Sequence, residues 1–222
     1  MTITEEDAIN VILESPAMPV IADRIASIKA EEAQRRRKFY DEITPSMKAE
    51  FINGQVVMHS PVTVAHVAVS GRLTCLFRTF VTKNQLGWLG VEKAMVSLTR
   101  NDFEPDLVFF RQAKAAEFKK EQLLLPAPDF VVEILSPSTT KNDRGVKMRD
   151  YAAHGVEEYW LVDPMEHFVE QYFLGPEQAF VLHEKLHEGT VHCHVLKGLA
   201  LPLAALFDDA ENMKAVAAVM AA

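Results

Sequence analysis

The spacing of apolar residues along the chain predicts helices and strands in mixed order. Segment 61–83 has an apolar helical face made by residues three or four positions apart, namely Val69, Leu73, Leu76, Phe77 and Phe80. Short apolar runs bounded by turn-forming residues, as is typical of strands, lie at 87–98, 104–112, 129–135 and 157–164. A polar helix predicted from about Asn142 to His154 follows the third of these runs.

The two ends of the chain differ in pattern. Residues 1–42 are predicted to be helical and peripheral, because Ile21, Ile25 and Ile28 recur at helical spacing before the charged "KAEEAQRRRK". The run "RRRK" is interpreted as a solvated helix end rather than a phosphate contact. Near the other end, "HFVEQYFL", "AFVLHEKL" and "TVHCHVL" alternate like an antiparallel meander, and an Ala-rich helix follows.

These elements predict the α/β (α+β) class, with a central mixed β-sheet flanked by helices. We expect an N-terminal helical extension at 1–42 and one domain at 43–222. The segment "AEFINGQVVMHSP" is predicted to be a hairpin whose turn is Asn53-Gly54, because this dipeptide is the strongest short-range hairpin signal.

Composition limits the class of protein. The 222 residues are 49% hydrophobic, and no apolar run approaches the ~18 residues of a membrane span. The acidic N-terminus lacks a signal-peptide pattern, and Cys75 and Cys193 are far apart, so we expect a cytoplasmic protein. The net charge of −8 counts against a protein that coats nucleic acid, but it leaves room for an enzyme with a locally basic cleft.

Two predicted strands each carry an acid among apolar residues. Glu133 lies inside "DFVVEIL", and Asp106 opens "DLVFF". Neighbouring strands would place the two carboxylates side by side, which requires a cation or a raised pKa. A hard divalent cation, Mg²⁺ or Mn²⁺, is the natural partner. Alternatively, Asp106 caps a turn, and Glu133 forms a buried salt bridge with Arg149 or Lys147.

Two further residues are candidates. Glu50 begins the predicted hairpin, and by itself it is better explained as a solvent-facing strand residue. Lys147 shares a helical face with Asp143 and Tyr151 and could reach back toward the carboxylates; otherwise it is a surface lysine.

The motifs together resemble a known family. Pro105-Asp106, "VVEILSPST", "KMRDYAAHGVEEYWLVDP" and "EFINGQVVMHSP" are similar to the Uma-type proteins, from about Tyr40 to about Leu174. That bacterial family is assigned to the restriction-endonuclease-like PD-(D/E)xK nucleases. The resemblance departs from the superfamily motif at Leu135, where a lysine is usual.

The resemblance implies a Mg²⁺-dependent (or Mn²⁺-dependent) DNA endonuclease. It assigns Asp106, Glu133 and the carbonyl of Ile134 as metal ligands, Glu50 as an additional acid, and Lys147 as the migrated catalytic lysine. A homodimer is expected as well. The competing hypothesis is a non-catalytic interaction protein that keeps the nuclease fold, favoured by the acidic net charge and by the lack of a DNA-reading module.

Histidines supply two weaker candidates. His66 is either a hydrogen-bond partner near the acids or an ordinary helix histidine. The cluster His183, His187, His192 and His194 matches no standard zinc spacing, and we interpret it as the polar face of a hairpin.

Overall fold

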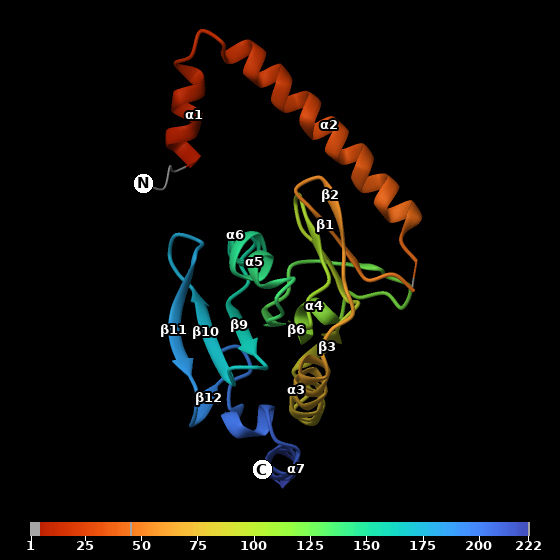
Figure 1. Cartoon of the computed structure of the whole chain (residues 1–222), viewed down its shortest axis with the longest axis vertical. Helices are drawn as coiled ribbons and strands as arrows, with labels where there is room; N and C mark the ends of the chain where they lie inside the picture. The colour runs from red at the N-terminus through yellow and green to blue at the C-terminus, as the bar shows by residue number, and fades with distance from the viewer. Residues whose placement is uncertain (1–4, 45, 222) are drawn as a thin grey trace.

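The computed structural model describes residues 5–44 and 46–221. Helix α1 (Glu5–Leu13) and the long helix α2 (Met18–Glu42) form an arm that extends away from the rest of the molecule (Figure 1). The C-terminal end of α2 attaches the arm, because Phe39 is buried in a small cluster with Ala49, Phe51 and Met95. No helix within the described ranges is long and apolar enough to cross a membrane.

A five-stranded sheet lies beneath the end of α2. Its strand order is β2-β1-β5-β4-β7. The strands are β1 (Ala49–Ile52), β2 (Gln55–Met58), β4 (Met95–Ser97), β5 (Asp102–Phe103) and β7 (Leu124–Leu125). The predicted hairpin is confirmed: β1 pairs antiparallel with β2, and Asn53 and Gly54 both have positive φ angles, 50° and 79°, as a two-residue turn of this kind requires.

The second large sheet has six strands in the order β11-β10-β9-β8-β6-β3. They are β3 (Gly87–Val91), β6 (Leu107–Arg111), β8 (Phe130–Ile134), β9 (Glu158–Asp163), β10 (Phe168–Leu174) and β11 (Phe180–Leu186). Strands β8 and β9 run parallel, and the other pairs run antiparallel. This is the mixed sheet that the sequence predicts.

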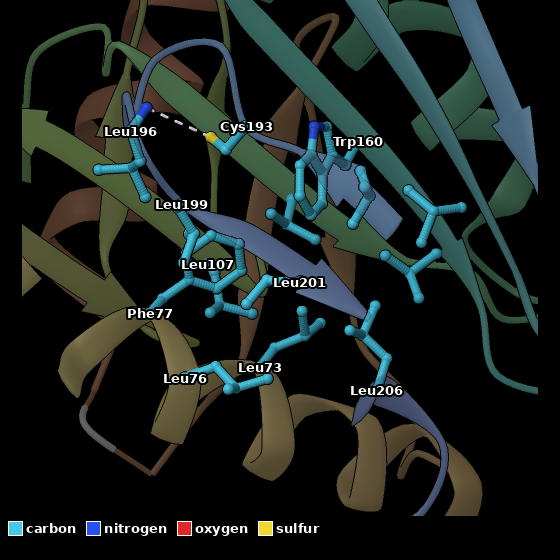
Figure 2. Packing of buried hydrophobic residues seen from close by; sticks show 14 of the residues in the cluster. Leu73, Leu76, Phe77, Leu107, Trp160, Cys193, Leu196, Leu199, Leu201 and Leu206 are labelled. Carbon is cyan, nitrogen blue, oxygen red and sulfur yellow. Dashed lines mark hydrogen bonds between the residues drawn. The ribbon is translucent and has the colours of Figure 1, made fainter. Parts of the chain in front are cut away.

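Helix α3 (Val64–Lys83) covers one face of the six-stranded sheet and confirms the predicted apolar stripe. Its residues Leu73, Leu76 and Phe77 pack against Trp160 of β9 and against the C-terminal leucines (Figure 2). Helix α7 (Asp209–Ala221) lies along α3, and Asn212 donates from Nδ2 to the carbonyl of Arg72 at 3.2 Å.

The opposite face of this sheet is covered by α4 (Gln112–Ala115) and a helical stretch that follows β8. That stretch consists of α5 (Thr140–Asn142), a π-helix (Asp143–Lys147) and α6 (Met148–Ala153). Tyr151 from α6 and Tyr159 from β9 are fully buried there. The helix predicted at 142–154 is therefore present, with a π-helical turn inside it.

A buried carboxylate connects β9 to the C-terminal loop. Glu158 accepts hydrogen bonds from Trp160 Nε1 at 2.7 Å, Gln171 Nε2 at 2.6 Å, Cys193 Sγ at 3.1 Å and the backbone N–H of Val195 at 2.7 Å. Neutral donors thus satisfy this acid without a buried cation. Its role is structural.

The structure confirms the fold class and corrects two details. The third run of the predicted meander, β12 (Thr190–His192), does not join β11 but pairs with β13 (Ala200–Pro202). The strands of the five-stranded sheet are two to four residues long, which is too short to show a clear alternation in sequence. For that reason the sequence did not predict this sheet as a separate unit.

Candidate active site

Asp106 and Glu133 lie opposite each other on neighbouring strands, as predicted. Strands β6 and β8 pair antiparallel with Leu107 opposite Val132. Continuing that register by one residue places Asp106 opposite Glu133. Both acids are almost completely buried.

One backbone N–H group and two side-chain nitrogen atoms lie close to the carboxylate of Asp106. The backbone N–H of Ile134 donates to Oδ2 at 2.7 Å, and Nε2 of His66 lies 3.3 Å from the same oxygen. Nζ of Lys48 lies 3.7 Å from Oδ1. Because the N–H and C=O of a strand residue point to the same side, the carbonyl of Ile134 also faces the strand edge beside Asp106.

Lys147 is buried at the centre of the acids. Its side chain is 2% exposed, and Nζ lies 2.9 Å from Oε1 of Glu50, 3.1 Å from Oε1 of Glu133 and 3.1 Å from Oδ1 of Asp143. The surface-lysine alternative is therefore wrong. Arg149, the other proposed partner of Glu133, is exposed.

The π-helix explains how Lys147 reaches this position. Residues Asp143–Lys147 form one wide turn between two α-helical segments, and both end residues are buried. Insertions of this kind occur often at functional sites because they redirect side chains without ending the helix. Asp143 and Lys147, four residues apart, thus both face the acids.

Glu50 comes from the other sheet. It is 1% exposed, so the solvent-facing interpretation is wrong. Besides Lys147, its Oε1 accepts a hydrogen bond from the backbone N–H of Glu104 at 2.9 Å, and Nε2 of His59 lies 3.2 Å from Oε2. The site is therefore assembled between the two large sheets, from residues on or next to their interior strands β1, β6 and β8.

Sequence reasoning missed four residues of the site, namely Asp143, Glu104, Lys48 and His59. Asp143 and Glu104 are buried, as is Asp106, but of these three acids only Asp106 was predicted to belong to the site. Lys48 and His59 flank the hairpin strands and line the same small cavity. A usable signal was present for Glu104, because "EPD" in an extended segment places Glu104 and Asp106 on one face.

The charges around Lys147 shift its pKa and that of Glu133. Burial would lower the pKa of Lys147, but the neighbouring carboxylates of Glu133, Glu50 and Asp143 outweigh it and raise that pKa well above its usual range. Burial raises the pKa of Glu133 well above its usual range despite Lys147, and Asp143 and Asp106 add to the rise. The ammonium group of Lys147 consequently stays charged.

The pKa values of Glu50 and Asp106 are lowered. Burial opposes this in both cases, but Lys147 and His59 outweigh it at Glu50, and His66 and Lys48 outweigh it at Asp106. The two acids are therefore ionised at neutral pH.

A cavity of about 30 Å³ opens among these groups and is lined by Lys48, His66, Asp106, Glu133 and Ile134, among others. That space exceeds the roughly 10–15 Å³ needed for one water-sized particle. Among residues 5–44 and 46–221, no group of three or more His, Cys, Asp or Glu side chains is arranged to hold a metal ion. Any cation here would therefore have to use fewer protein side chains.

The predicted histidine candidates have separate environments. His66 is buried on α3 beside Asp106 and belongs to the site. His183 and His194 lie against the ring of Phe173, with centroids 4.4 and 5.0 Å away, and His187 lies 5.4 Å from Phe168. These three histidines pack on the aromatic side chains of β10.

Comparisons with known proteins agree with this fold. A crystal structure of a nuclease described as "putative" and as belonging to DUF820, from Anabaena variabilis, has a TM-score of 0.65 at 20% identity, covering 76% of this chain and 94% of that chain. At this identity the likeness shows the fold alone. Among curated proteins, none matches. The Uma2 family model, described as "Putative restriction endonuclease", matches residues 33–204, and the chain therefore belongs to the Uma2 family.

Proposed function

We propose that the protein is a divalent-metal-dependent endonuclease of the PD-(D/E)xK type that hydrolyses phosphodiester bonds in DNA. The single observation that carries the proposal is the juxtaposition of Asp106, Glu133 and the buried Lys147 around one small cavity. Family membership supports the same reaction class. A cytoplasmic location remains a prediction from the cysteine usage.

The donor set fits Mg²⁺ or Mn²⁺. Mg²⁺ is usually bound by one or two carboxylates plus waters and substrate phosphates, not by a closed cage of protein ligands. Asp106 and Glu133 supply two carboxylates, and the carbonyl of Ile134 lies at the same strand edge. Glu50 and Asp143 add two more buried carboxyl groups beside Lys147, so acids outnumber the one buried lysine here.

Each residue of the site has a role in this proposal. Asp106, Glu133 and the Ile134 carbonyl would hold the ion, which when bound polarises the phosphate and lowers the pKa of a water. Lys147 places a positive charge where charge develops on the phosphate. Glu50 positions Lys147 through the 2.9 Å contact, and His66 fixes the orientation of Asp106.

Cleavage assays test the proposal. Purified protein should nick plasmid DNA with Mg²⁺ or Mn²⁺ and not with EDTA, and divalent metal should raise its melting temperature, because the ion binds the folded state. Asp106→Asn should lose both effects. Glu184→Gln, which changes an exposed carboxylate of β11 outside the site, should keep both.

Two results would contradict this function. Equal metal-induced shifts in wild type and Asp106→Asn would place the cation elsewhere. Metal binding with no cleavage of plasmid, linear or single-stranded DNA would favour the non-catalytic scaffold.

The same proposal includes a homodimer, supported by the N-terminal arm. The arm exposes large apolar side chains that are 37–71% accessible: Ile9, Val11, Leu13, Val20, Ile25 and Ile28. An isolated helical arm in water is marginal, so such a surface calls for a partner. A second copy fits because α2 carries a repeating stripe of four-three spacing, namely Ile21, Ile25, Ile28, Glu32, Arg35 and Phe39.

The C-terminal part of this stripe, from Glu32 to Phe39, already contacts the rest of the chain. Phe39 is in the core, Arg35 donates to the carbonyl of Gly54 at 2.8 Å, and Glu32 pairs with Arg100. The N-terminal part, Ile21 to Ile28, continues the same face, and Ile25 and Ile28 line an open pocket there together with Thr99 and Arg100. Two arms that bury their apolar side chains against each other would cover on the order of 1,000 Å² in total, the lower range of specific interfaces.

A further inference from the structure

An apolar pocket borders the catalytic cavity. It has a volume of about 390 Å³, within the roughly 300–1,000 Å³ typical of small-molecule sites. Its apolar walls are Tyr40, Ile43, Met47, Met95, Leu123 and Leu124. The catalytic roles proposed above use none of these side chains.

Two features connect the pocket to the cavity. Glu104 lines both of them. Consecutive residues of the chain also divide between them, since Met47 lines the pocket and Lys48 lines the cavity. A ligand that occupies both would therefore need a polar end in the cavity and a flat or apolar end in the pocket, close together.

Glu104 offers a hydrogen-bonding group at this junction. Its Oε2 accepts the backbone N–H of Ala49 at 3.1 Å, which fixes the carboxyl group. The other carboxylate oxygen, Oε1, can accept from an exocyclic amino group of a base, as acids do from cytosine N4.

The walls suit a flat aromatic ring. Tyr40 is held in place because its hydroxyl donates to Oδ1 of Asp102 at 2.8 Å. Leu123, which also lines the pocket, is 80% exposed, so the pocket opens to solvent. Bases in a duplex are stacked and paired and cannot enter a side pocket, whereas an unpaired base can be splayed out onto such side chains.

We propose that this pocket binds one unpaired nucleobase of a single-stranded DNA segment, next to the phosphate held in the catalytic cavity. The proposal rests on the proposed function for the position of that phosphate. A nucleotide carries its anionic phosphate and its flat base one sugar apart, which matches the adjacent cavity and pocket. The contact at Oε1 favours adenine, cytosine and guanine, which carry an amino group, over thymine, which has none.

A scan of abasic sites along a single-stranded 12-mer tests the proposal. Binding to the full-length protein is measured by fluorescence anisotropy, in EDTA and separately with Ca²⁺. Each oligonucleotide lacks one base and keeps every phosphate. Removal of the base at one position should weaken binding by about 5- to 150-fold, the range for one stacked base, and removal elsewhere should have little effect.

Variants of the pocket identify it as the binding site. Leu123→Ala/Leu124→Ala removes one wall and should reduce the penalty of the sensitive abasic position. Val181→Ala/Leu182→Ala, an exposed apolar pair on β11, should leave the penalty unchanged. In wild type, thymine at the sensitive position should bind more weakly than the other bases, and Glu104→Gln should remove this difference, because an amide both donates and accepts.

The possible results distinguish the proposed base binding in the pocket from the proposed hydrolysis. A flat scan, no binding of the strand in either buffer, or an unchanged scan in Leu123→Ala/Leu124→Ala overturns the base pocket. If the scan peak is present and no metal supports cleavage, the pocket stands and the hydrolytic function fails. If DNA is cut but the scan is flat, the function stands and the pocket fails.

Discussion

At the scale of single residues, Lys147 decides how the acids can coexist. Its ammonium lies within 3.1 Å of an oxygen of Glu50, Glu133 and Asp143. Catalytic and structural roles were alternatives in the sequence, but the geometry makes them compatible. The ammonium group of Lys147 neutralises part of the negative charge of these acids. The same residue lines the cavity where, in the proposed function, a phosphate would bind.

Lys147→Met should therefore lower both stability and cleavage. Removing one partner of a buried ion cluster costs about 3–5 kcal/mol, because the carboxylates remain buried without their cation. Cleavage should fall by orders of magnitude, since a placed charge contributes roughly 3 kcal/mol to the transition state. Urea unfolding and nicking rates measure the two effects. Exposed Lys141→Met, from the same helical stretch, serves as the control.

The stability loss in Lys147→Met should depend on pH. Without the ammonium, the folded-state pKa values of Glu133 and Asp143, already raised by burial, rise further above their unfolded values. A carboxyl group with a raised pKa destabilises the fold at pH values where it is ionised in the unfolded chain. The loss should thus be largest near neutral pH and shrink toward pH 5. A loss that grows on acidification would contradict this account of the site.

At the scale of elements, the sequence predicted most long features. The apolar stripe of α3, the Asn53-Gly54 hairpin and the strand around Glu133 all follow from spacing over several residues. Pairings between distant segments could not be predicted this way. Glu50 looked solvent-facing because its burial depends on Lys147 and on the backbone of Glu104, far along the chain.

The attachment of α2 is another long-range feature that the sequence did not reveal. Arg36 donates from Nε and Nη2 to the two oxygens of Asp102, both at 2.7 Å, and Nη2 also lies 2.7 Å from the carbonyl of Leu98. The run "RRRK" was interpreted as solvated, yet this one member is committed to a fully buried aspartate. Four neighbouring basic residues look alike in sequence, and only the fold distinguishes them.

Arg36→Met should loosen the arm from the domain. Among the described residues, the hydroxyl of Tyr40 would remain as the one side-chain donor to the carboxylate of Asp102. Leaving such an aspartate without its cation costs about 3–5 kcal/mol. Amide hydrogen exchange should rise in residues 32–42 and in β5. Arg37→Met, one residue later and exposed, should change stability by less than about 0.5 kcal/mol. Equal exchange in the two variants would mean that Phe39 alone holds the helix.

At the scale of the whole molecule, the site and the arm lie in different parts of the fold. The acids meet between the two large sheets, while α1 and most of α2 extend outward (Figure 1). Cutting both strands of a duplex requires two such sites or two successive events at one site. A dimer joined through the arms would place two copies of the proposed active site on one particle without altering either cavity.

The dimer can be tested at the exposed apolar residues of α2. Ile25→Ser/Ile28→Ser removes apolar surface from the free part of the α2 stripe, where neither side chain is buried in the single chain. If the stripes pair, sedimentation equilibrium should show a dimer for wild type and a monomer for the variant, because the interface loses its hydrophobic contribution. The unfolding midpoint of the catalytic domain should change little. Val181→Ser/Leu182→Ser, exposed on β11, should stay dimeric. A wild-type monomer at micromolar concentration, or a variant as dimeric as wild type, would show that the arm serves another partner or none.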